Sequence, residues 1–144
     1  MIQRASSADA PAAAAMACRL FGSLSPEEAM AEMAGLIARP DCAVFLARTD
    51  GDTVGFAQCQ LRRDYVEGTA TSPVGYLEGI YVSPSHRGRG VARALLARCE
   101  EWARAQGCAE FASDCELSNE ASLAFHLGVG FAEANRIICF VKAL

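Results

Sequence analysis

The chain has 144 residues, of which 52% are hydrophobic and 21% charged, and these values are typical of one globular domain spanning residues 1–144. No apolar run reaches the length that spans a bilayer, so we expect no membrane insertion. The net charge of −4 argues against nucleic acid as a partner and favours a cationic ligand.

The cysteines and the N-terminus indicate a reducing compartment. Seven cysteines are scattered along the chain without a C-x-x-C pair, which favours small buried thiols over disulfides or a metal site. Cys99 is expected in the core, whereas Cys115 is the candidate for an exposed thiol, and no histidine has the spacing of a cysteine nucleophile pair. The N-terminus lacks a signal-peptide pattern, so we expect a cytoplasmic protein. From the cysteine pattern we expect no metal.

The first quarter of the chain predicts one strand and two helices. Residues 2–5 form a short strand, and Asp9 with Pro11 marks the start of a helix that ends near Leu20. The run Ser25-Pro26-Glu27-Glu28 repeats the start signal for a second helix, which ends near Ala38. The residues around Phe21 therefore connect two helices.

Three strands follow. Residues 43–48 and 54–62 are apolar runs joined by Thr49-Asp50-Gly51-Asp52, which is a hairpin signal. Residues 64–72 are polar and rich in turn formers, and residues 74–82 form the third strand.

The turn after this third strand is typical of an anion site. Pro84 ends the strand, Gly88 and Gly90 precede an amphipathic helix, and Gly107 ends that helix. The first amides of a helix lack intrahelical acceptors and point at any anion placed there. Two glycines in such a turn also occur without a ligand. A nucleotide P-loop is excluded because no lysine followed by Ser or Thr ends the loop, and the turn lacks the G-x-G-x-x-G spacing of a dinucleotide fold. The turn therefore predicts a diphosphate site.

The remaining residues complete an α/β domain. We expect a strand over 109–113, a helix from 119 to about 128 and a final strand over 137–141. The final strand is apolar, and we expect it at an edge of the sheet, where it pairs with a second subunit to give a homodimer.

Two carboxylates are candidates for chemistry. In the third strand, period-two alternation places Glu78 on one face with Tyr76, Ile80 and Val82. A carboxylate on an apolar face is costly without a partner, so Glu78 marks either a solvated strand end or a cation site. Asp114 follows the next strand and faces the same site if the two strands are neighbours. An aspartate at that position is also a common turn residue.

The turn Arg87-x-x-Gly90-x-Ala92 resembles that of the GCN5-related N-acetyltransferases, and a second block supports the resemblance: Asn119, Ser122, Phe125, His126, Gly130 and Phe131. The resemblance implies acetyl-CoA as cosubstrate and a mixed, mostly antiparallel sheet flanked by helices. It also implies that the strands ending at Val82 and Ser113 splay apart to admit acetyl-CoA. The cofactor-binding residues it implies are Ile80, Tyr81, Val82, Arg87, Gly88, Arg89, Gly90, Val91, Ala92, Arg93 and Asn119.

A narrower likeness covers the chain from about Val54 to the C-terminus. Three runs are similar to the aminoglycoside 6'-N-acetyltransferases: Asp64-Tyr65-Val66, Leu77-Glu78-Gly79-Ile80-Tyr81-Val82 and Ala112-Ser113-Asp114. This likeness implies a cationic aminoglycoside substrate, contacted by Phe21, Tyr65, Glu78, Asp114 and Asn135. The family usually has tryptophan at the position of Phe21 and an acidic residue at the position of Asn135.

The implied reaction is direct transfer within a ternary complex, and it needs a proton acceptor. Carboxylates bind an ammonium group, but only the neutral amine attacks a thioester. Glu78, acting through water, and Asp114 are the candidate bases, and the rigid strand position favours Glu78. His126 is a candidate acid for the leaving thiolate, or else simply a packed or hydrogen-bonded histidine. A backbone amide near Tyr81 or Val82 is expected to polarise the thioester carbonyl.

Two other functions stay open. The same fold acetylates other amines, such as a polyamine or a protein N-terminus. A catalytically silent acyl-CoA-binding module is the third possibility, and it leaves the pairing of Glu78 with Asp114 without a role.

Overall fold

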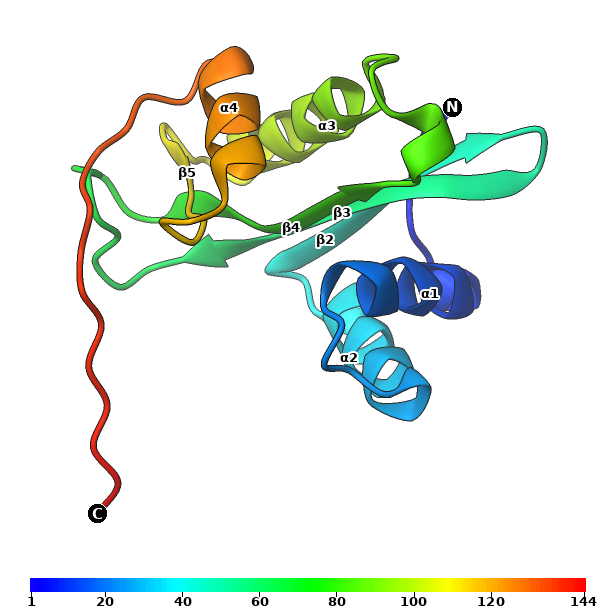
Figure 1. Cartoon of the computed structure of the whole chain (residues 1–144), viewed down its shortest axis with the longest axis horizontal. Coiled ribbons are helices and arrows are strands. Elements are labelled where there is room, and N and C mark those ends of the chain that lie inside the picture. The colour runs from blue at the N-terminus through cyan, green and yellow to red at the C-terminus, as the bar shows by residue number, and fades with distance from the viewer.

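A computed structural model describes residues 1–144 and shows an α/β fold, with one five-stranded sheet between two layers of helices (Figure 1). The strands lie in the order β1-β2-β3-β4-β5. The first three pairings are antiparallel and the β4–β5 pairing is parallel. The predicted mixed, mostly antiparallel sheet is therefore confirmed.

The strands are β1 (Ile2–Arg4), β2 (Cys42–Thr49), β3 (Asp52–Arg62), β4 (Val74–Val82) and β5 (Phe111–Ser113). The helices are α1 (Ala10–Leu20), α2 (Pro26–Ala38), α3 (Val91–Ala105) and α4 (Glu120–Gly128), with short 3-10 turns η1 (Ser7–Asp9) and η2 (Pro84–His86). The predicted elements agree closely with these bounds up to the end of α4.

Local chemistry explains several of these boundaries. Asp50 and Gly51, with φ of 51° and 88°, form the predicted hairpin turn between β2 and β3, because a two-residue hairpin needs left-handed backbone at both central positions. The Ser25 hydroxyl accepts a hydrogen bond from the Glu28 amide at 3.1 Å and caps α2. Asn119 caps α4 in the same way, accepting from the Ser122 amide at 3.1 Å.

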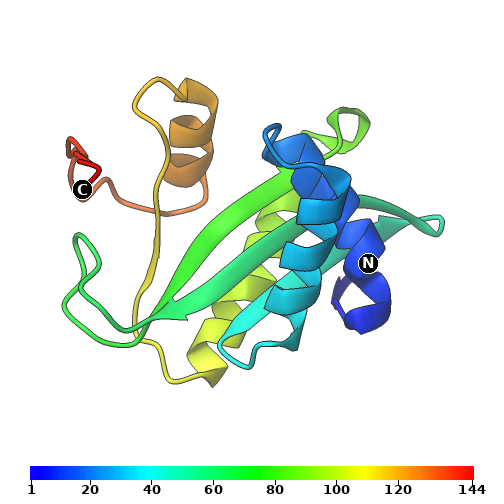
Figure 2. The same cartoon turned by 90° about the horizontal axis from the view of Figure 1, so that it is seen from below.

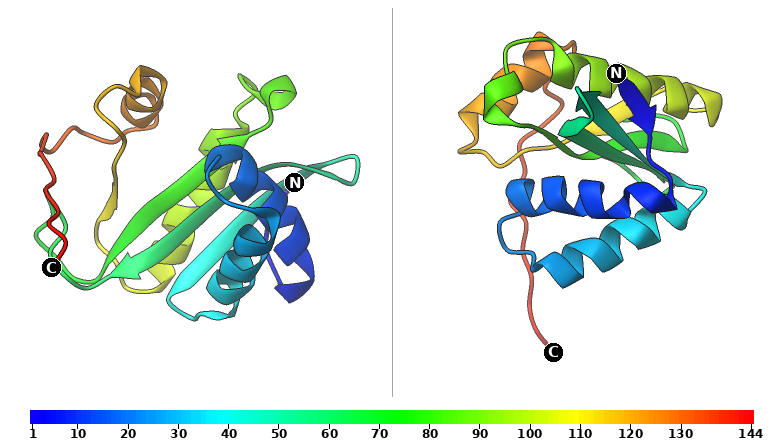
Figure 3. Two further views of the ribbon diagram at one scale, coloured as in Figure 1. Left: turned by 60° about the horizontal axis from the view of Figure 1, so that its bottom comes forward. Right: turned by 90° about the vertical axis from the view of Figure 1, so that its right-hand side faces the viewer.

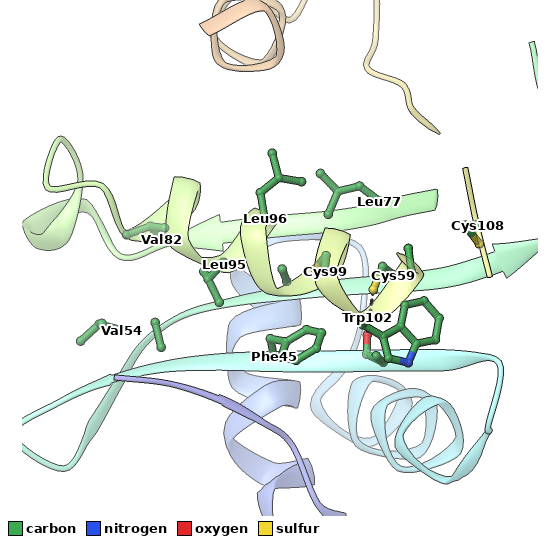
Figure 4. Close-up of a cluster of buried hydrophobic side chains, with 14 residues drawn as sticks. Phe45, Val54, Cys59, Leu77, Val82, Leu95, Leu96, Cys99, Trp102 and Cys108 are labelled. Carbon is green, nitrogen blue, oxygen red and sulfur yellow. Dashed lines mark hydrogen bonds between the residues drawn. The ribbon is translucent and has the colours of Figure 1, made fainter. Parts of the chain in front are cut away.

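The two helical layers bury separate cores. Helices α1 and α2 cover one face of the sheet, and α3 covers the other (Figures 2 and 3). Between α3 and the sheet lies a core that includes Phe45, Leu77, Leu95, Cys99 and Trp102 (Figure 4). The core under α1 and α2 is built from Met16, Met33, Val44, Leu46 and Phe56 with small alanines. Strand β4 thus packs against helices on both faces of the sheet.

Strands β4 and β5 pair over a short length and then separate. Their parallel pairing consists of Gly75 with Phe111, Tyr76 with Ala112 and Leu77 with Ser113. Because β5 ends at Ser113, the rest of β4 has no neighbouring strand on that side. The predicted gap between the strands ending at Val82 and Ser113 is confirmed.

The strand predicted over residues 137–141 is wrong for the single chain. Residues 131–144 contain no helix or strand, and beyond Asn135, which bonds to Glu67, they run away from the rest of the chain (Figure 1). Phe140 is 91% exposed and Val141 98%. A strand needs a neighbour to bond its backbone groups, and this segment has none within its own chain.

The two cysteines with an individual prediction agree with it: Cys99 is buried and Cys115 is exposed. None of the helices has the length and the apolar composition that crossing a bilayer requires. No group of three or more histidine, cysteine, aspartate or glutamate side chains is arranged to hold a metal ion.

Candidate active site

The turn between β4 and α3 has the backbone of an anion cradle. Gly88 and Gly90 have φ of 70° and 80°, a region that residues with a Cβ rarely adopt. An added Cβ on either glycine would meet no protein atom within 4 Å. Backbone conformation therefore explains the glycines, and the space above the turn is open to a ligand.

Helix α3 directs unbonded amides into that space. The carbonyl of Gly90 accepts from the Ala94 amide at 3.0 Å, and the amides of Val91, Ala92 and Arg93, which come before Ala94, have no acceptor within the helix. The helix dipole adds to their attraction for an anion. The diphosphate of acetyl-CoA fits this arrangement of three free amides and two open glycines.

Three arginines surround the turn, and two of them also hold it in place. Arg87 donates from Nε to the carbonyl of Val82 at 2.8 Å, which ties the turn to the end of β4. Arg93 donates to the carbonyl of Gly128 at 3.0 Å, which ties α3 to the end of α4. Arg89 is exposed beside them. Together they add positive charge where an anion is expected.

The amide that faces the β4–β5 gap follows from the hydrogen-bond alternation of β4. Ser83 donates its amide to Val54 of β3 at 2.8 Å, so the amide of Val82 points away from β3 and into the gap. The amide of Ile80 points the same way and that of Tyr81 faces β3. Of the two amides predicted to polarise a carbonyl, Val82 has the required direction and Tyr81 does not.

Glu78 is the extra residue of a β-bulge. Gly79 is paired with Gln58 and Leu77 with the adjacent Cys59, so no residue of β3 lies opposite Glu78. A bulge re-aims the side chain that it carries and shifts the alternation beyond it.

This bulge makes part of the predicted face of β4 wrong. Ile80 and Val82 pack in the core under α3, on the face opposite Glu78. Tyr76 lies on the other face, because it pairs with Gln60, which follows Phe56 of the α1–α2 core by a period of two. Tyr76 therefore shares a face with Glu78, as predicted, and the two aliphatic residues do not.

Glu78 is bound by an arginine from β3. Arg62 donates from Nη2 to both carboxylate oxygens, at 2.7 and 3.0 Å, and from Nε to Oε1 at 3.0 Å. The guanidinium carbon lies 3.5 Å from the centre of the Tyr76 ring, a cation–π geometry. The Arg62 side chain remains 38% exposed and that of Glu78 23%. The carboxylate is thus already paired with a cation.

Asp114 reaches the same tyrosine. Burial raises the pKa of Tyr76 to about 12, and the charge of Asp114 adds to this effect. Asp114 itself is exposed, directly after β5. We call Glu78, Asp114, Arg62 and Tyr76 the carboxylate site. Glu78 and Asp114 are thus both near enough to Tyr76 for their charges to act on its hydroxyl.

Phe21 and Tyr65 lie beside this site. A Cβ added to Gly79 would come within 3.0 Å of the Phe21 ring, so that ring covers the backbone next to Glu78. Tyr65 is 76% exposed. It lines, with Arg62, a hollow of about 360 Å³ formed by residues 60–65.

Asn135 contacts none of the four residues of the carboxylate site through a hydrogen bond. Its Nδ2 donates to Glu67 Oε1 at 2.8 Å, and its Oδ1 accepts from the Arg136 amide at 2.8 Å. The side chain therefore supports the loop that carries Tyr65.

The loop over residues 64–72 is anchored by Glu110. Its carboxylate accepts hydrogen bonds from the amides of Ala70 and Thr71, at 2.9 and 2.8 Å, and from the Thr71 hydroxyl. The Thr71 hydroxyl and these amides lower the pKa of Glu110. The anchor fixes the loop that carries Tyr65 against the start of β5.

His126 of α4 is hydrogen-bonded through both ring nitrogens. Nδ1 lies 2.7 Å from the carbonyl oxygen of Ser122, which places the ring N–H on Nδ1. Nε2 then accepts from the Ser113 hydroxyl at 2.8 Å. That hydroxyl also lies 3.3 Å from the carbonyl of Leu77, to which it donates when His126 is protonated on both nitrogens. A Ser113–His126 pair therefore lies where β4 and β5 separate.

Asn119, an expected cofactor contact, is first of all a helix cap. Its Oδ1 accepts from the Ser122 amide, which leaves the side-chain nitrogen and the second lone pair of Oδ1 for a ligand.

Sequence reasoning missed Arg62, Ser113 and Glu110. Arg62 carried one signal, since it is a charged residue at the end of an apolar strand and shares a hairpin with β4. Its contact with Glu78 depends on the β3–β4 register and the bulge, which no local pattern specifies.

The description "Acetyltransferase (GNAT) family" belongs to a family model that matches residues 11–131. The chain belongs to the GNAT acetyltransferase family. The turn between β4 and α3, which we call the diphosphate turn, lies within the matched residues, as do strands β4 and β5 and helix α4.

Similar proteins agree with this assignment. Aminoglycoside N(6')-acetyltransferase type 1 of Serratia marcescens is 44% identical over 131 residues, which is 90% of each chain. The apo structure of aminoglycoside antibiotic 6'-N-acetyltransferase AAC(6')-Ig from Acinetobacter haemolyticus is 39% identical, with a TM-score of 0.95, covering 100% of this chain and 99% of the other. AAC(6')-Iy in complex with the bisubstrate analogue CoA-S-monomethyl-acetylneamine is 34% identical, with a TM-score of 0.96, covering 100% and 98%.

Proposed function

We propose that the chain transfers the acetyl group of acetyl-CoA to the 6'-amino group of aminoglycoside antibiotics, which gives resistance to them. The observation that carries this proposal is the position of Glu78 and Asp114, two carboxylates around one tyrosine at the place where β4 and β5 separate. Such a site suits a polycation. The 44% identical relative with the corresponding name supports the same substrate class.

We propose that residues 1–144 act as one N-acetyltransferase domain. The acetyl group passes directly to the drug within a ternary complex of enzyme, acetyl-CoA and aminoglycoside. Acetyl-CoA supplies an activated thioester. The free amine attacks the thioester carbon, and the Val82 amide stabilises the negative charge that develops on the carbonyl oxygen. Through a water molecule, Glu78 takes the proton that the 6'-ammonium group must lose before the amine attacks, and Asp114 binds a neighbouring ammonium group of the drug.

The C–S bond then breaks and the proton goes to the thiolate of coenzyme A. We propose that His126, when protonated on both ring nitrogens, gives its Nε2 proton to the Ser113 oxygen, while the Ser113 hydroxyl gives its own proton to the thiolate instead of to the Leu77 carbonyl. Thiols have an ordinary pKa of about 8.5, so the thiolate leaves readily and this acid contributes less than the base.

An acetyl-transfer assay that detects released thiol tests the function. We expect turnover with aminoglycosides that carry a 6'-amine and none with those that carry a 6'-hydroxyl. Turnover with a polyamine or a peptide N-terminus in place of the drugs would support the runner-up, another GNAT amine acetyltransferase. Tight acetyl-CoA binding without transfer to any amine would mean a silent binding module.

We also propose a homodimer formed by residues 132–144, which we call the C-terminal arm. Five large apolar residues of the arm are at least 65% exposed: Ile137, Ile138, Phe140, Val141 and Leu144. Strand β5 is an edge strand whose outer side is unpaired. An extended apolar arm and an open edge are complementary, so each arm adds a strand to β5 of a second copy.

Sedimentation of the wild type and of Phe140→Asp tests the dimer. We expect a dimer for the wild type and a shift toward monomer for the variant, because a charge in a strand interface opposes pairing. Lys142→Asp, which changes charge near the end of the arm without removing an apolar side chain, is the control. A monomeric wild type would contradict this proposal.

We place the enzyme in the cytoplasm, where acetyl-CoA and reduced cysteines are both found.

A further inference from the structure

The strongest ion pair in the carboxylate site joins two residues of the enzyme itself. Arg62 makes three hydrogen bonds to Glu78 and stacks on Tyr76, so it uses both oxygens of the carboxylate. A substrate ammonium group would need the same oxygens and the same aromatic face. The guanidinium therefore lies where the function proposed above requires a cation of the drug.

The two cations cannot share this position without repulsion. Arg62 and an ammonium group are both positive, and a single carboxylate neutralises one of them. Either the drug binds elsewhere or Arg62 moves away from Glu78 when the drug arrives.

The surroundings of Arg62 allow that movement. Its side chain is 38% exposed, and the contacts that rotation would give up are those with Glu78 and the Tyr76 ring. The adjoining hollow of about 360 Å³ is also lined by Asp64, whose carboxylate makes no hydrogen bond or ion pair in the structure. Asp64, two residues along the chain, is thus an unpaired carboxylate in the hollow that Arg62 also lines.

We propose that Arg62 is a displaceable counter-ion, which holds Glu78 in the free enzyme and is replaced there by an ammonium group of the aminoglycoside. Arg62 is then a specificity-determining residue. Only a ligand with enough positive charge to compete for Glu78 and occupy the neighbouring Asp114 removes it. The inference rests on the function proposed above, because it assumes that the drug binds at Glu78.

Calorimetric titration of kanamycin into Arg62→Met tests this inference. Methionine keeps a long side chain over Tyr76 but cannot pair with Glu78. If Arg62 blocks Glu78 in most free molecules, its removal lowers the apparent Kd about 3- to 10-fold. Arg63→Met removes the same charge from the adjacent residue, and we expect less than about a 2-fold change from it.

A double-mutant cycle separates displacement from simple charge repulsion. In the Glu78→Gln background the position is no longer an ion pair, so Arg62→Met should no longer tighten binding. Equal tightening in both backgrounds, or equal tightening by Arg63→Met, would overturn the inference. So would a loss of kcat in Arg62→Met without a gain in affinity, because Arg62 would then merely position Glu78.

The wild type distinguishes this inference from the function on which it depends. If the wild type neither binds nor acetylates kanamycin, the proposed function is wrong. If it does both and Arg62→Met binds no more tightly, only the role of Arg62 is wrong. The KM for acetyl-CoA reports folding of each variant, and Arg62→Gln is the second variant if Arg62→Met does not fold.

Discussion

The diphosphate turn and the carboxylate site lie at the two ends of the gap beside β4, and they are built in different ways. The turn is a contiguous run of backbone, with two left-handed glycines followed by free helix amides. The carboxylate site is made of side chains from β3, β4 and the residue after β5, and it depends on a bulge. Changes in the two regions should therefore affect different substrates, acetyl-CoA for the turn and the amine for the carboxylates.

The largest effect is expected from Glu78→Gln. The change keeps the shape of the side chain and removes the proposed base, so kcat for acetyl transfer should fall about 100-fold or more. The KM for acetyl-CoA should stay near its wild-type value. Steady-state kinetics with both substrates measure this, with Glu101→Gln on the exposed side of α3 as the control. An unchanged kcat would exclude Glu78 as the base.

Gly90→Asp should break the other region. A side chain at φ of 80° is strained, and its carboxylate points into the space proposed for the diphosphate. We expect the KM for acetyl-CoA to rise about 30-fold, the equivalent of about 2 kcal/mol of lost binding. Gly107→Asp is the matched control, because Gly107 has a φ of 89° at the far end of the same helix. If both variants raise this KM equally, strain alone is responsible.

Asp114→Asn should weaken drug binding more than catalysis. The change removes one charge-assisted hydrogen bond to an ammonium group, so the KM for the drug should rise about 10-fold with a smaller change in kcat. Asp52→Asn, an equal change of charge at the distant β2–β3 hairpin, serves as the comparison in the same assay. Drug kinetics that Asp114→Asn leaves untouched would remove Asp114 from the site.

Tyr76→Phe should have the smallest effect, visible in alkaline solution. Burial raises the pKa of Tyr76 from 10.0 to about 12. The unfolded chain loses this proton first, so stability is fully present below about pH 10 and is lost as pH rises toward about 12. Urea unfolding near neutral and at alkaline pH should show a weaker pH dependence for Tyr76→Phe than for wild type. Tyr65→Phe, at a 76% exposed residue, should behave like wild type.

The contrast between the two regions also explains what could be predicted from sequence. The turn, its helix and the α/β element order as far as α4 follow from residues adjacent in the chain, and the structure agrees with them. Glu78 and Asp114 could be singled out because a carboxylate within an apolar strand and another directly after a strand are both conspicuous. Arg62 was not, since its contact with Glu78 depends on pairing between distant segments. The prediction that Ile80 shares a face with Glu78 was wrong, because the bulge shifts the two-residue alternation of side chains along β4.

The C-terminal arm shows a different limit. Its composition predicts a strand, and composition alone cannot say which chain provides the neighbour. Within one chain the arm stays extended and exposed. A strand forms only where a second strand bonds its backbone groups, so the sequence of one chain could not show whether this segment is a strand.

The most direct test of the account is a crystal structure with coenzyme A and a 6'-amino aminoglycoside bound together. We expect the diphosphate on the amides of residues 91–93 and the 6'-nitrogen hydrogen-bonded to Glu78, directly or through one water. A drug bound away from Glu78 and Asp114, with its 6'-nitrogen remote from the β4–β5 gap, would contradict the account.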